Sequence, residues 1–189
     1  MKMTKEKPLS ILFIGNSHTY YNDMPLMVRQ RAIECGYDCR VTMIAHGGWF
    51  LAQHVEEPDV RFNILYGGYD YVVLQEHAHP FGPVEKFRDA VVILNKWIRE
   101  AGSTPVIYDT WAKKSEPERQ EEMNAAHKLV ADEIDALLAQ VGVNWWDYQK
   151  CWSELEMYDE DGAHASAAGS DFAAKHIWET ILTDLGKTD

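Results

Sequence analysis

Cysteine, basic side chains and long apolar runs are all scarce in this chain of 189 residues. The three cysteines, Cys35, Cys39 and Cys151, are too few and odd in number for a disulfide framework, and no two form a CxxC redox pair. Only 18 Lys and Arg stand against 30 Asp and Glu, so the net charge is -12. This balance argues against nucleic acid or an anionic membrane as the main partner. No apolar run approaches the length of a transmembrane helix.

The sequence also lacks repeats, low-complexity tracts and linker-like stretches. Its first ten residues are charged and contain no apolar segment of the kind found in a secretory signal peptide. Hydrophobic residues make up 46% of the chain and charged residues 25%, which is ordinary for a globular protein. We therefore expect one cytoplasmic domain over residues 1–189.

Short apolar runs that stop at glycine or at polar residues are typical of strands buried on both faces. The first such run covers residues 11–14 and stops at Gly15. Further strands are predicted over residues 40–45, 71–74, 104–108 and 143–146. Apolar residues at helical spacing predict helices between the strands, over residues 25–34, about 49–57, 87–101, 116–140 and 170–185, while residues 60–66 are ambiguous.

Strands that alternate with helices indicate an α/β fold, in which helices cover both faces of a parallel sheet. Right-handed crossovers leave few topologies. We expect a flavodoxin-like three-layer sandwich with five parallel strands in the order 2-1-3-4-5. In that order, the crevice where the sheet reverses is bordered by Ser17, after the first strand, and by residues 75–79, after the third. The Gly47-Gly48 turn lies beside it.

Ser17 follows the first strand at the edge where ligands bind in open α/β sheets. A serine nucleophile needs a base within hydrogen-bond reach, and the base needs an acid that orients it. His164 and Asp161 are three residues apart on a glycine-containing loop before the last helix, so one loop would supply both groups. The alternatives are a serine that only caps the next helix and a solvated acidic loop with a surface histidine.

Three blocks in order resemble one known family. GNSHT after the first strand, GG after the second and DGAHASAAGS before the last helix are similar to the SGNH (GDSL-like) hydrolase superfamily. The resemblance is closer to a bacterial subgroup with GNSxTYYND and VVLQE blocks, and it extends from Ile11 to about Ala174. It implies that Ser17 is the nucleophile, that His164 is the general base and later the acid, and that Asp161 orients His164.

The resemblance also implies an oxyanion hole made of the serine amide, a glycine amide from the second block and an asparagine side chain from the third. Ser17 and Gly48 match the first two, and Gly47 is an alternative because the doublet leaves the register open. In the third block, QEHA stands where the family has Gly-x-Asn-Asp. Gln75 has an amide that could donate to the oxyanion, and His77 occupies the asparagine column. We favour Gln75, because VVLQE is typical of the subgroup.

The function implied by the resemblance is a serine esterase. It would cleave a small acyl or acetyl ester of a small molecule, such as an acetylated carbohydrate, through an acyl-enzyme and without a cofactor. The altered third block suggests an alternative, a non-catalytic module that binds a carbohydrate or acyl ligand on the same fold. The GxSxG elbow of α/β-hydrolases is absent, since Thr19 stands where its second glycine would be.

A metal-assisted hydrolase is a third alternative. His77 and His79 form an HxH pair, which on a strand would face one side as zinc ligands sometimes do. With Asp161 and His164 they could hold a metal ion for hydrolysis. No carboxylate-rich motif completes a coordination shell at the other strand ends, so we expect no metal.

Several aromatic residues also lie near predicted strand ends, and they would either line an aromatic pocket or pack as ordinary core and rim residues. They are Tyr20, Tyr21, Trp49 and Trp111.

Overall fold

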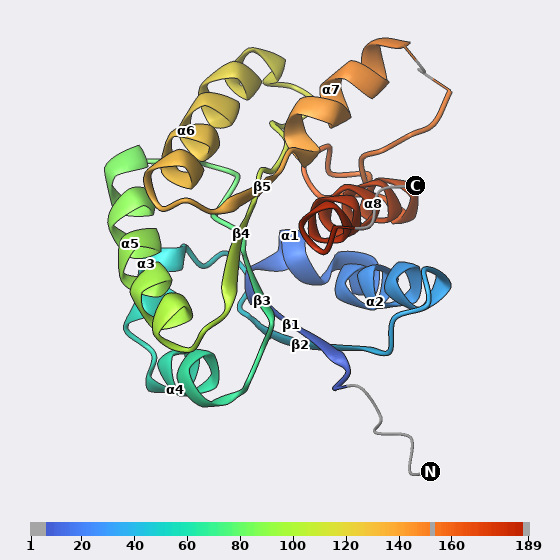
Figure 1. Cartoon of the computed structure of the whole chain (residues 1–189). Helices are drawn as coiled ribbons and strands as arrows, with labels where there is room; N and C mark the ends of the chain where they lie inside the picture. Colours follow the sequence, from blue (N-terminus) through green and yellow to red (C-terminus); the bar gives the residue numbers. More distant parts are fainter. Residues whose placement is uncertain (1–6, 152–153, 187–189) are drawn as a thin grey trace.

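The computed structural model describes residues 7–151 and 154–186, and it contains a parallel sheet between two layers of helices (Figure 1). The strands are β1 (Leu9–Gly15), β2 (Cys39–Ala45), β3 (Tyr71–Leu74), β4 (Thr104–Tyr108) and β5 (Leu137–Ala139). The α-helices are α1 (Ser17–Tyr20), α2 (Met24–Glu34), α3 (Leu51–Val55), α4 (Pro58–Tyr66), α5 (Val84–Glu100), α6 (Gln120–Glu133), α7 (Val141–Cys151) and α8 (Ala167–Asp184). Two short 3₁₀ helices are η1 (Tyr21–Asp23) and η2 (Pro117–Arg119).

The strands are hydrogen-bonded in the order β2-β1-β3-β4-β5, and every neighbouring pair is parallel. The predicted fold class and strand order are therefore confirmed. Gly15 pairs with Ala45, and Ile14 pairs with Leu74. Because parallel strands end at the same edge, the segments that follow β1, β2 and β3 emerge side by side.

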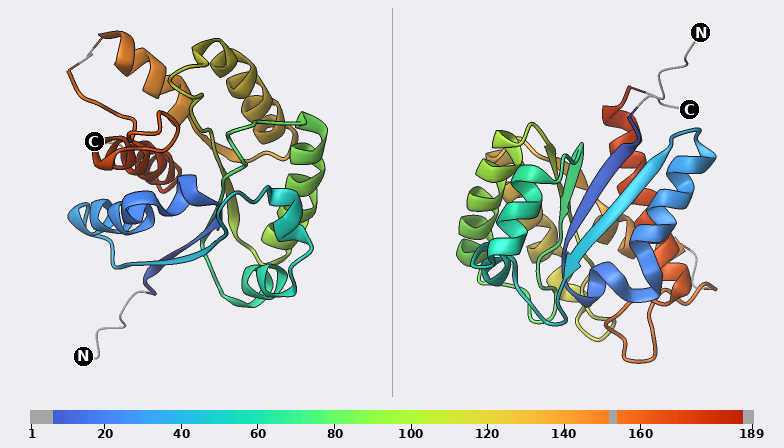
Figure 2. Two further views of the ribbon diagram at one scale, coloured as in Figure 1. Left: turned by 180° about the vertical axis from the view of Figure 1, so that it is seen from behind. Right: turned by 90° about the horizontal axis from the view of Figure 1, so that it is seen from below.

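The sheet separates two hydrophobic cores, and β1 contributes to both. Ile11 and Phe13 point into the core under α2, α7 and α8, while Leu12 and Ile14 point into the core under α3, α4, α5 and α6. All four side chains are fully buried. The two helical layers are seen on opposite faces of the sheet in Figure 2. Burial on both faces explains why β1 is an unbroken apolar run rather than an alternating one.

The long helix predicted over residues 116–140 is wrong in its C-terminal part. Helix α6 ends at Glu133, and β5 follows within the range that was assigned to the helix. Asp135 adopts a positive φ of 53°, a left-handed conformation that breaks a right-handed helix. The apolar residues after it then pair with β4 as the edge strand of the sheet.

The fifth strand was predicted over residues 143–146, and this prediction is also wrong. These residues belong to α7. The run contains valine and two tryptophans, which favour strands, but packing overrides that preference. Trp145 is fully buried and stacks on Trp111, with ring centroids 3.9 Å apart and planes 9° apart. The ambiguous residues 60–66 form most of α4.

The helices lie against the faces of the sheet, as Figure 1 shows. The longest of them, α8, carries charged residues along its exposed side and buries Ala174, Ile177 and Ile181. Within the two described stretches of chain, no helix is both long enough and apolar enough to cross a membrane.

Candidate active site

Ser17 is the first residue of α1, one residue beyond the turn that ends β1. The turn needs glycine at position 15, because a Cβ atom there would lie 2.6 Å from the Gln75 side-chain oxygen and would also collide with Thr19. Asn16 caps α1, since its side-chain oxygen accepts a hydrogen bond from the His18 amide at 3.1 Å. The close packing of this turn fixes the Ser17 side chain at the carboxyl-terminal edge of the sheet.

The structure gives Gln75 a role other than the predicted oxyanion donor. Its side chain is only 1% exposed. Its amide oxygen accepts hydrogen bonds from the Asn16 backbone amide and from the Thr19 hydroxyl, both at 2.9 Å, and its amide nitrogen faces the Glu76 carbonyl. With both ends of the amide engaged inside the fold, Gln75 braces the turn that carries Ser17.

The candidate base and its orienting acid lie on a hairpin-like loop before α8. Tyr158 and Ala165 form an antiparallel bridge, and the Asp159 amide donates to the His164 carbonyl at 2.8 Å. Gly162 takes a positive φ of 65°, which a glycine adopts without strain. The reversal at Gly162 turns the Asp161 carboxylate back onto the residues that follow it.

The structure brings Ser17, His164 and Asp161 into one hydrogen-bonded line. Ser17 Oγ lies 2.8 Å from His164 Nε2, and His164 Nδ1 lies 2.5 Å from Asp161 Oδ2. A carboxylate only accepts hydrogen bonds, so Nδ1 carries the proton and Nε2 is free to accept from the serine hydroxyl. This is the tautomer that a general base requires.

The second oxygen of Asp161 is also held in place. Oδ1 accepts hydrogen bonds from the backbone amides of Ala163 and His164, both at 2.9 Å. Burial works against the charged form of this carboxyl, but the hydrogen bonds from the His164 ring and the two amides outweigh it and lower its pKa to about 2. Asp161 is therefore negatively charged at any pH near neutrality.

Asn22 joins the N-terminal and C-terminal parts of the site. Its side-chain nitrogen donates to the Ala165 carbonyl at 3.0 Å and to the Ser170 hydroxyl at 2.9 Å. Its φ is 54°, a left-handed conformation that asparagine tolerates better than most residues. The sequence interpretation did not single out Asn22. The signal available was an Asn-Asp pair directly after an aromatic pair.

The Gly47-Gly48 turn lies beside Ser17. The His46 amide donates to the Gly15 carbonyl at 3.1 Å, and the Asn16 side chain donates to the Trp49 carbonyl at 2.8 Å. Gly48 has a positive φ of 75°. Within the part of the chain that the structure describes, the backbone amides of Ser17 and Gly48 donate to no acceptor. Both amides can therefore serve a ligand.

The sequence matches no protein-family model, and a search among curated proteins finds no match. Solved structures do match. A candidate SGNH hydrolase from Slackia heliotrinireducens superposes with a TM-score of 0.81 at 29% identity, over 93% of this chain and 100% of the other. The chain belongs to the SGNH (GDSL-like) hydrolase superfamily.

Solved structures of lower sequence identity superpose on nearly the whole chain as well. The esterase EstA from Pseudoalteromonas sp. has a TM-score of 0.70 at 12% identity, over 94% of this chain and 99% of its own. A carbohydrate esterase of family 3 from Talaromyces cellulolyticus has a TM-score of 0.72 at 12% identity, over 96% and 100%. At such low identity these two likenesses show the shared fold alone.

In this SGNH protein, His77 is poorly placed to replace the family asparagine. Its Nδ1 lies 3.0 Å from the Pro80 carbonyl oxygen, so Nδ1 carries the proton and Nε2 of the neutral ring is an acceptor. Its ring stacks on Phe50, with centroids 4.3 Å apart. Among the described residues, no three His, Cys, Asp or Glu side chains converge as a metal site would require.

His18 is a component of the candidate site that the sequence interpretation overlooked. Its ring centroid lies 4.9 Å from that of His164 and 5.0 Å from that of His79. Burial, together with the neighbouring His79 and His164, lowers the pKa of His18 well below its usual value. His18 is therefore a neutral spacer between the candidate base and the loop after β3.

Trp111 supports the His164 loop from the interior of the protein and does not line a pocket. It is fully buried, and its indole nitrogen donates to the Ala163 carbonyl at 2.8 Å. Tyr21, by contrast, faces the site, because its ring stacks on His164 with centroids 4.1 Å apart and planes 11° apart. Among the aromatic residues named from the sequence, these two therefore have opposite roles.

Proposed function

We propose that this protein is a serine hydrolase that cleaves a carboxylic ester through an acyl-enzyme. The observation that carries the proposal is the line of hydrogen bonds from Ser17 Oγ to His164 Nε2, 2.8 Å, and from His164 Nδ1 to Asp161 Oδ2, 2.5 Å. Nucleophile, base and orienting acid are thus in contact before any substrate arrives.

In the first half of the reaction, Ser17 Oγ attacks the ester carbonyl while its proton passes to His164 Nε2. The ring becomes positively charged beside Asp161, whose carboxylate stabilises that charge and holds the ring in its orientation. The lowered pKa of Asp161, about 2, keeps the carboxylate ionised throughout. Collapse of the tetrahedral intermediate sends the proton from His164 to the leaving alcohol.

The oxyanion of that intermediate needs donors in fixed positions. The free backbone amides of Ser17 and Gly48 supply two, with Gly47 as the alternative to Gly48 in the same turn. Gln75 is occupied elsewhere, so no side-chain donor from the third block is assigned. Because one lost donor costs about 10²–10³ in rate, we expect a modest turnover number.

In the second half, a water molecule takes the place of the alcohol. His164 removes its proton, the water attacks the acyl-enzyme carbonyl, and Ser17 leaves with the proton that His164 returns. Acid, alcohol and the free enzyme result. The substrate is a small acyl or acetyl ester. The printed descriptions of two structural neighbours, an esterase and a carbohydrate esterase, support ester chemistry on this fold.

Phosphonate chemistry offers a direct test, since the EstA structure is one inhibited by monoethylphosphonate. We expect a fluorophosphonate to label this protein once, on the peptide that contains Ser17. Ser17→Ala should lose the label and about 10⁴-fold of its p-nitrophenyl acetate turnover, with unchanged circular dichroism. Ser115→Ala, at an exposed serine outside the site, is the matched control.

Undiminished turnover by Ser17→Ala in a clean preparation, or a label at another residue, would contradict the nucleophile assignment. The engaged amide of Gln75 gives some support to the alternative, a non-catalytic module that binds carbohydrate or acyl ligands. The same experiment separates the two functions, because a binding module gives neither the covalent label nor ester turnover.

A further inference from the structure

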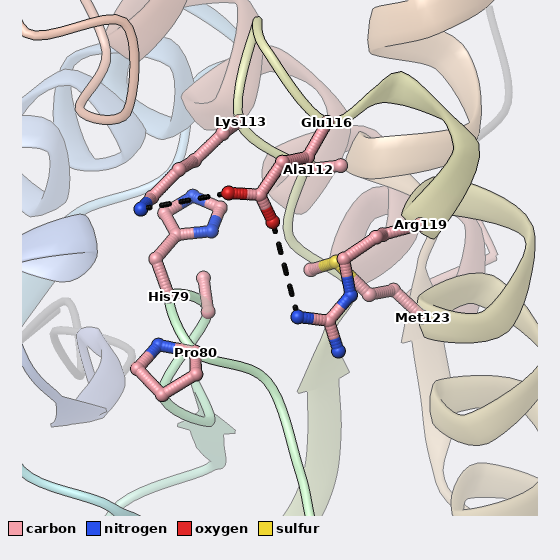
Figure 3. Close-up of a pocket in the computed structure, with 8 residues that line it drawn as sticks. His79, Pro80, Ala112, Lys113, Glu116, Arg119 and Met123 are labelled. Atoms are coloured by element: carbon pink, nitrogen blue, oxygen red, sulfur yellow. Dashed lines mark ion pairs between the residues drawn. The ribbon is translucent and has the colours of Figure 1, made fainter.

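A cavity of about 230 Å³ lies between the loop after β3 and the segment after β4 (Figure 3). We call it the cationic pocket, after the side chains at its rim. Its polar lining consists of His79, Lys113, Glu116 and Arg119, and its apolar floor includes Ala112 and Met123. Neither the proposed hydrolysis nor the sequence motifs account for this set of residues.

The charges at the rim are only loosely paired. Glu116 approaches Lys113 at 3.8 Å and Arg119 at 3.9 Å, the two ion pairs drawn in Figure 3. Arg119 also approaches Glu122, outside the cavity lining, at 3.7 Å. All these distances are near the limit for an ion pair, and exposed pairs of this kind contribute little. The lining itself carries two cations and one carboxylate, in a chain whose net charge is -12.

His79 contributes a neutral imidazole ring to the lining of the same cavity. Within the described residues, its buried Nε2 has no hydrogen-bond partner. Burial, followed by the positive charge of Lys113, lowers the pKa of His79 to about 4, so its ring is neutral at physiological pH.

The cationic pocket lies close to the Ser17–His164 pair, and the same residues support both. The His18 ring lies between His164 and His79, 4.9 Å from the first and 5.0 Å from the second by ring centroids. The Lys114 amide donates to the Gly162 carbonyl at 2.9 Å, which ties the wall of the pocket to the loop that carries His164. The pocket therefore lies next to the candidate site, with the His18 ring between His164 and the His79 side of the pocket.

We propose that the cationic pocket binds a carboxylate carried by the ester substrate, so that this enzyme prefers anionic esters over neutral esters of the same length. The inference rests on the proposed function. The planar guanidinium of Arg119 suits a carboxylate, and Lys113 adds a mobile point charge. One excess positive charge in the lining suits a singly charged group better than a dianion, because Glu116 would repel the second charge.

The test compares matched esters. Mono-p-nitrophenyl succinate carries the carboxylate on the acyl side, and p-nitrophenyl valerate is its neutral partner. 4-Carboxyphenyl acetate carries the carboxylate on the alcohol side. Its neutral partner is the corresponding methyl ester, methyl 4-acetoxybenzoate. The quantity measured is the ratio of kcat/KM between charged and neutral partners, which cancels any general loss of activity.

We expect a higher ratio in the wild type for one of the two pairs, and Lys113→Met and Arg119→Met should each lower that ratio about 10-fold, as for loss of a charged hydrogen bond. Added salt should lower it as well. Lys86→Met is the matched control: Lys86 is an exposed lysine of α5 that lines a different cavity, and its loss should leave the ratio unchanged. Ratios that do not respond to Lys113 or Arg119 would overturn the proposal.

A binding measurement keeps this inference separate from the proposed function. Succinamate, which carries a single carboxylate, but not neutral succinamide, should shift the imidazole NMR signals of His79 in a saturable way. Lys113→Met should weaken that effect about 10-fold. Saturable shifts without turnover of any ester would contradict the hydrolase and leave the pocket assignment standing, whereas an unresponsive His79 would refute the pocket even in an active enzyme.

Discussion

Two aspartate–histidine pairs lie near the carboxyl ends of the strands, and they contrast in burial. His164 Nδ1 lies 2.5 Å from Asp161 Oδ2, and the side chains of Asp161 and His164 are 46% and 22% exposed. His127 Nδ1 lies 3.3 Å from Asp109 Oδ1, and each of these side chains is 1% exposed. The residue types are the same, so any difference in their chemistry comes from the surroundings.

The protonation states of the two pairs are opposite. Hydrogen bonds outweigh burial at Asp161 and lower its pKa to about 2. At Asp109 burial dominates over the amide hydrogen bonds from Gly142 and Val143 and raises the pKa to about 7, and burial lowers the pKa of His127 to about 4. One pair is thus anchored by a fixed negative charge, while folding drives the other toward two neutral groups.

The two imidazoles also differ in what their nitrogens meet. His164 Nδ1 donates a hydrogen bond to Asp161, and His164 Nε2 lies within hydrogen-bond distance of the Ser17 hydroxyl. His127 donates Nδ1 to the Met123 carbonyl at 2.7 Å, and its Nε2 has no partner within the described residues. An Asp–His pair becomes a candidate catalytic unit only when the free nitrogen reaches a hydroxyl at the surface of a cleft.

Between the two pairs, the largest effect is expected from Asp161→Asn. The amide oxygen can still accept from the two backbone amides, but the NH₂ group faces His164 Nδ1 and forces the proton onto Nε2. The base is then in the wrong tautomer, and kcat/KM for p-nitrophenyl acetate should fall about 10³–10⁴-fold with little change in melting temperature. Asp109→Asn serves as the comparison and should keep its turnover. Equal losses in both variants would show that the buried pair also takes part in catalysis.

The buried pair should instead govern how stability depends on pH. Folded Asp109 keeps its proton up to about pH 7, whereas an unfolded aspartate loses it near 3.8, so this residue lowers stability as pH rises between these values. Folded His127 releases its proton near pH 4 and an unfolded histidine near 6.5, so it raises stability over that window. In the wild type the two contributions largely cancel between about pH 4 and 6.5.

Replacing either residue of the buried pair should reveal the pH dependence of stability that the other residue contributes. Relative to wild type, the unfolding free energy of Asp109→Asn should rise with pH in this window, and that of His127→Gln should fall, each with a slope of up to about 1.4 kcal/mol per pH unit. Urea denaturation at half-unit steps of pH measures both slopes. Slopes of the same sign in the two variants would contradict the assigned protonation states.

The smallest effect concerns the aromatic ring beside each imidazole. Tyr21 stacks on His164 at 4.1 Å between centroids, and Phe81 stacks on His127 at 5.1 Å. Tyr21→Leu should lower kcat about 3–10-fold, the size of one aromatic contact, because the ring of the base loses a flat support. Tyr21→Phe keeps the stack and is the control. A loss of equal size in Tyr21→Phe would point to the hydroxyl instead.

Local patterns were sufficient for most of the fold. The apolar runs of β1, β3 and β4 are visible in the sequence, because strands buried on both faces tolerate few polar residues. The glycine that ends β1 and the glycine pair after β2 are visible as well. The pattern misled at residues 137–146. There the stripe that continued past α6 belongs to an edge strand, and the valine–tryptophan run belongs to a helix whose Trp145 stacks on Trp111. Such packing depends on residues that are distant in sequence.

The amino-acid sequence by itself determined the class of the fold, the strand order and the short-range relation between Asp161 and His164, because these depend on periodicity, handed crossovers and a three-residue spacing. Only the tertiary structure decided that Ser17 meets His164, that Gln75 turns inward to bind Asn16 and Thr19, and that Lys113 and Arg119 gather beside His79. Contacts between distant segments are set by packing and burial, and the same physics distinguishes the exposed Asp161–His164 pair from the buried Asp109–His127 pair.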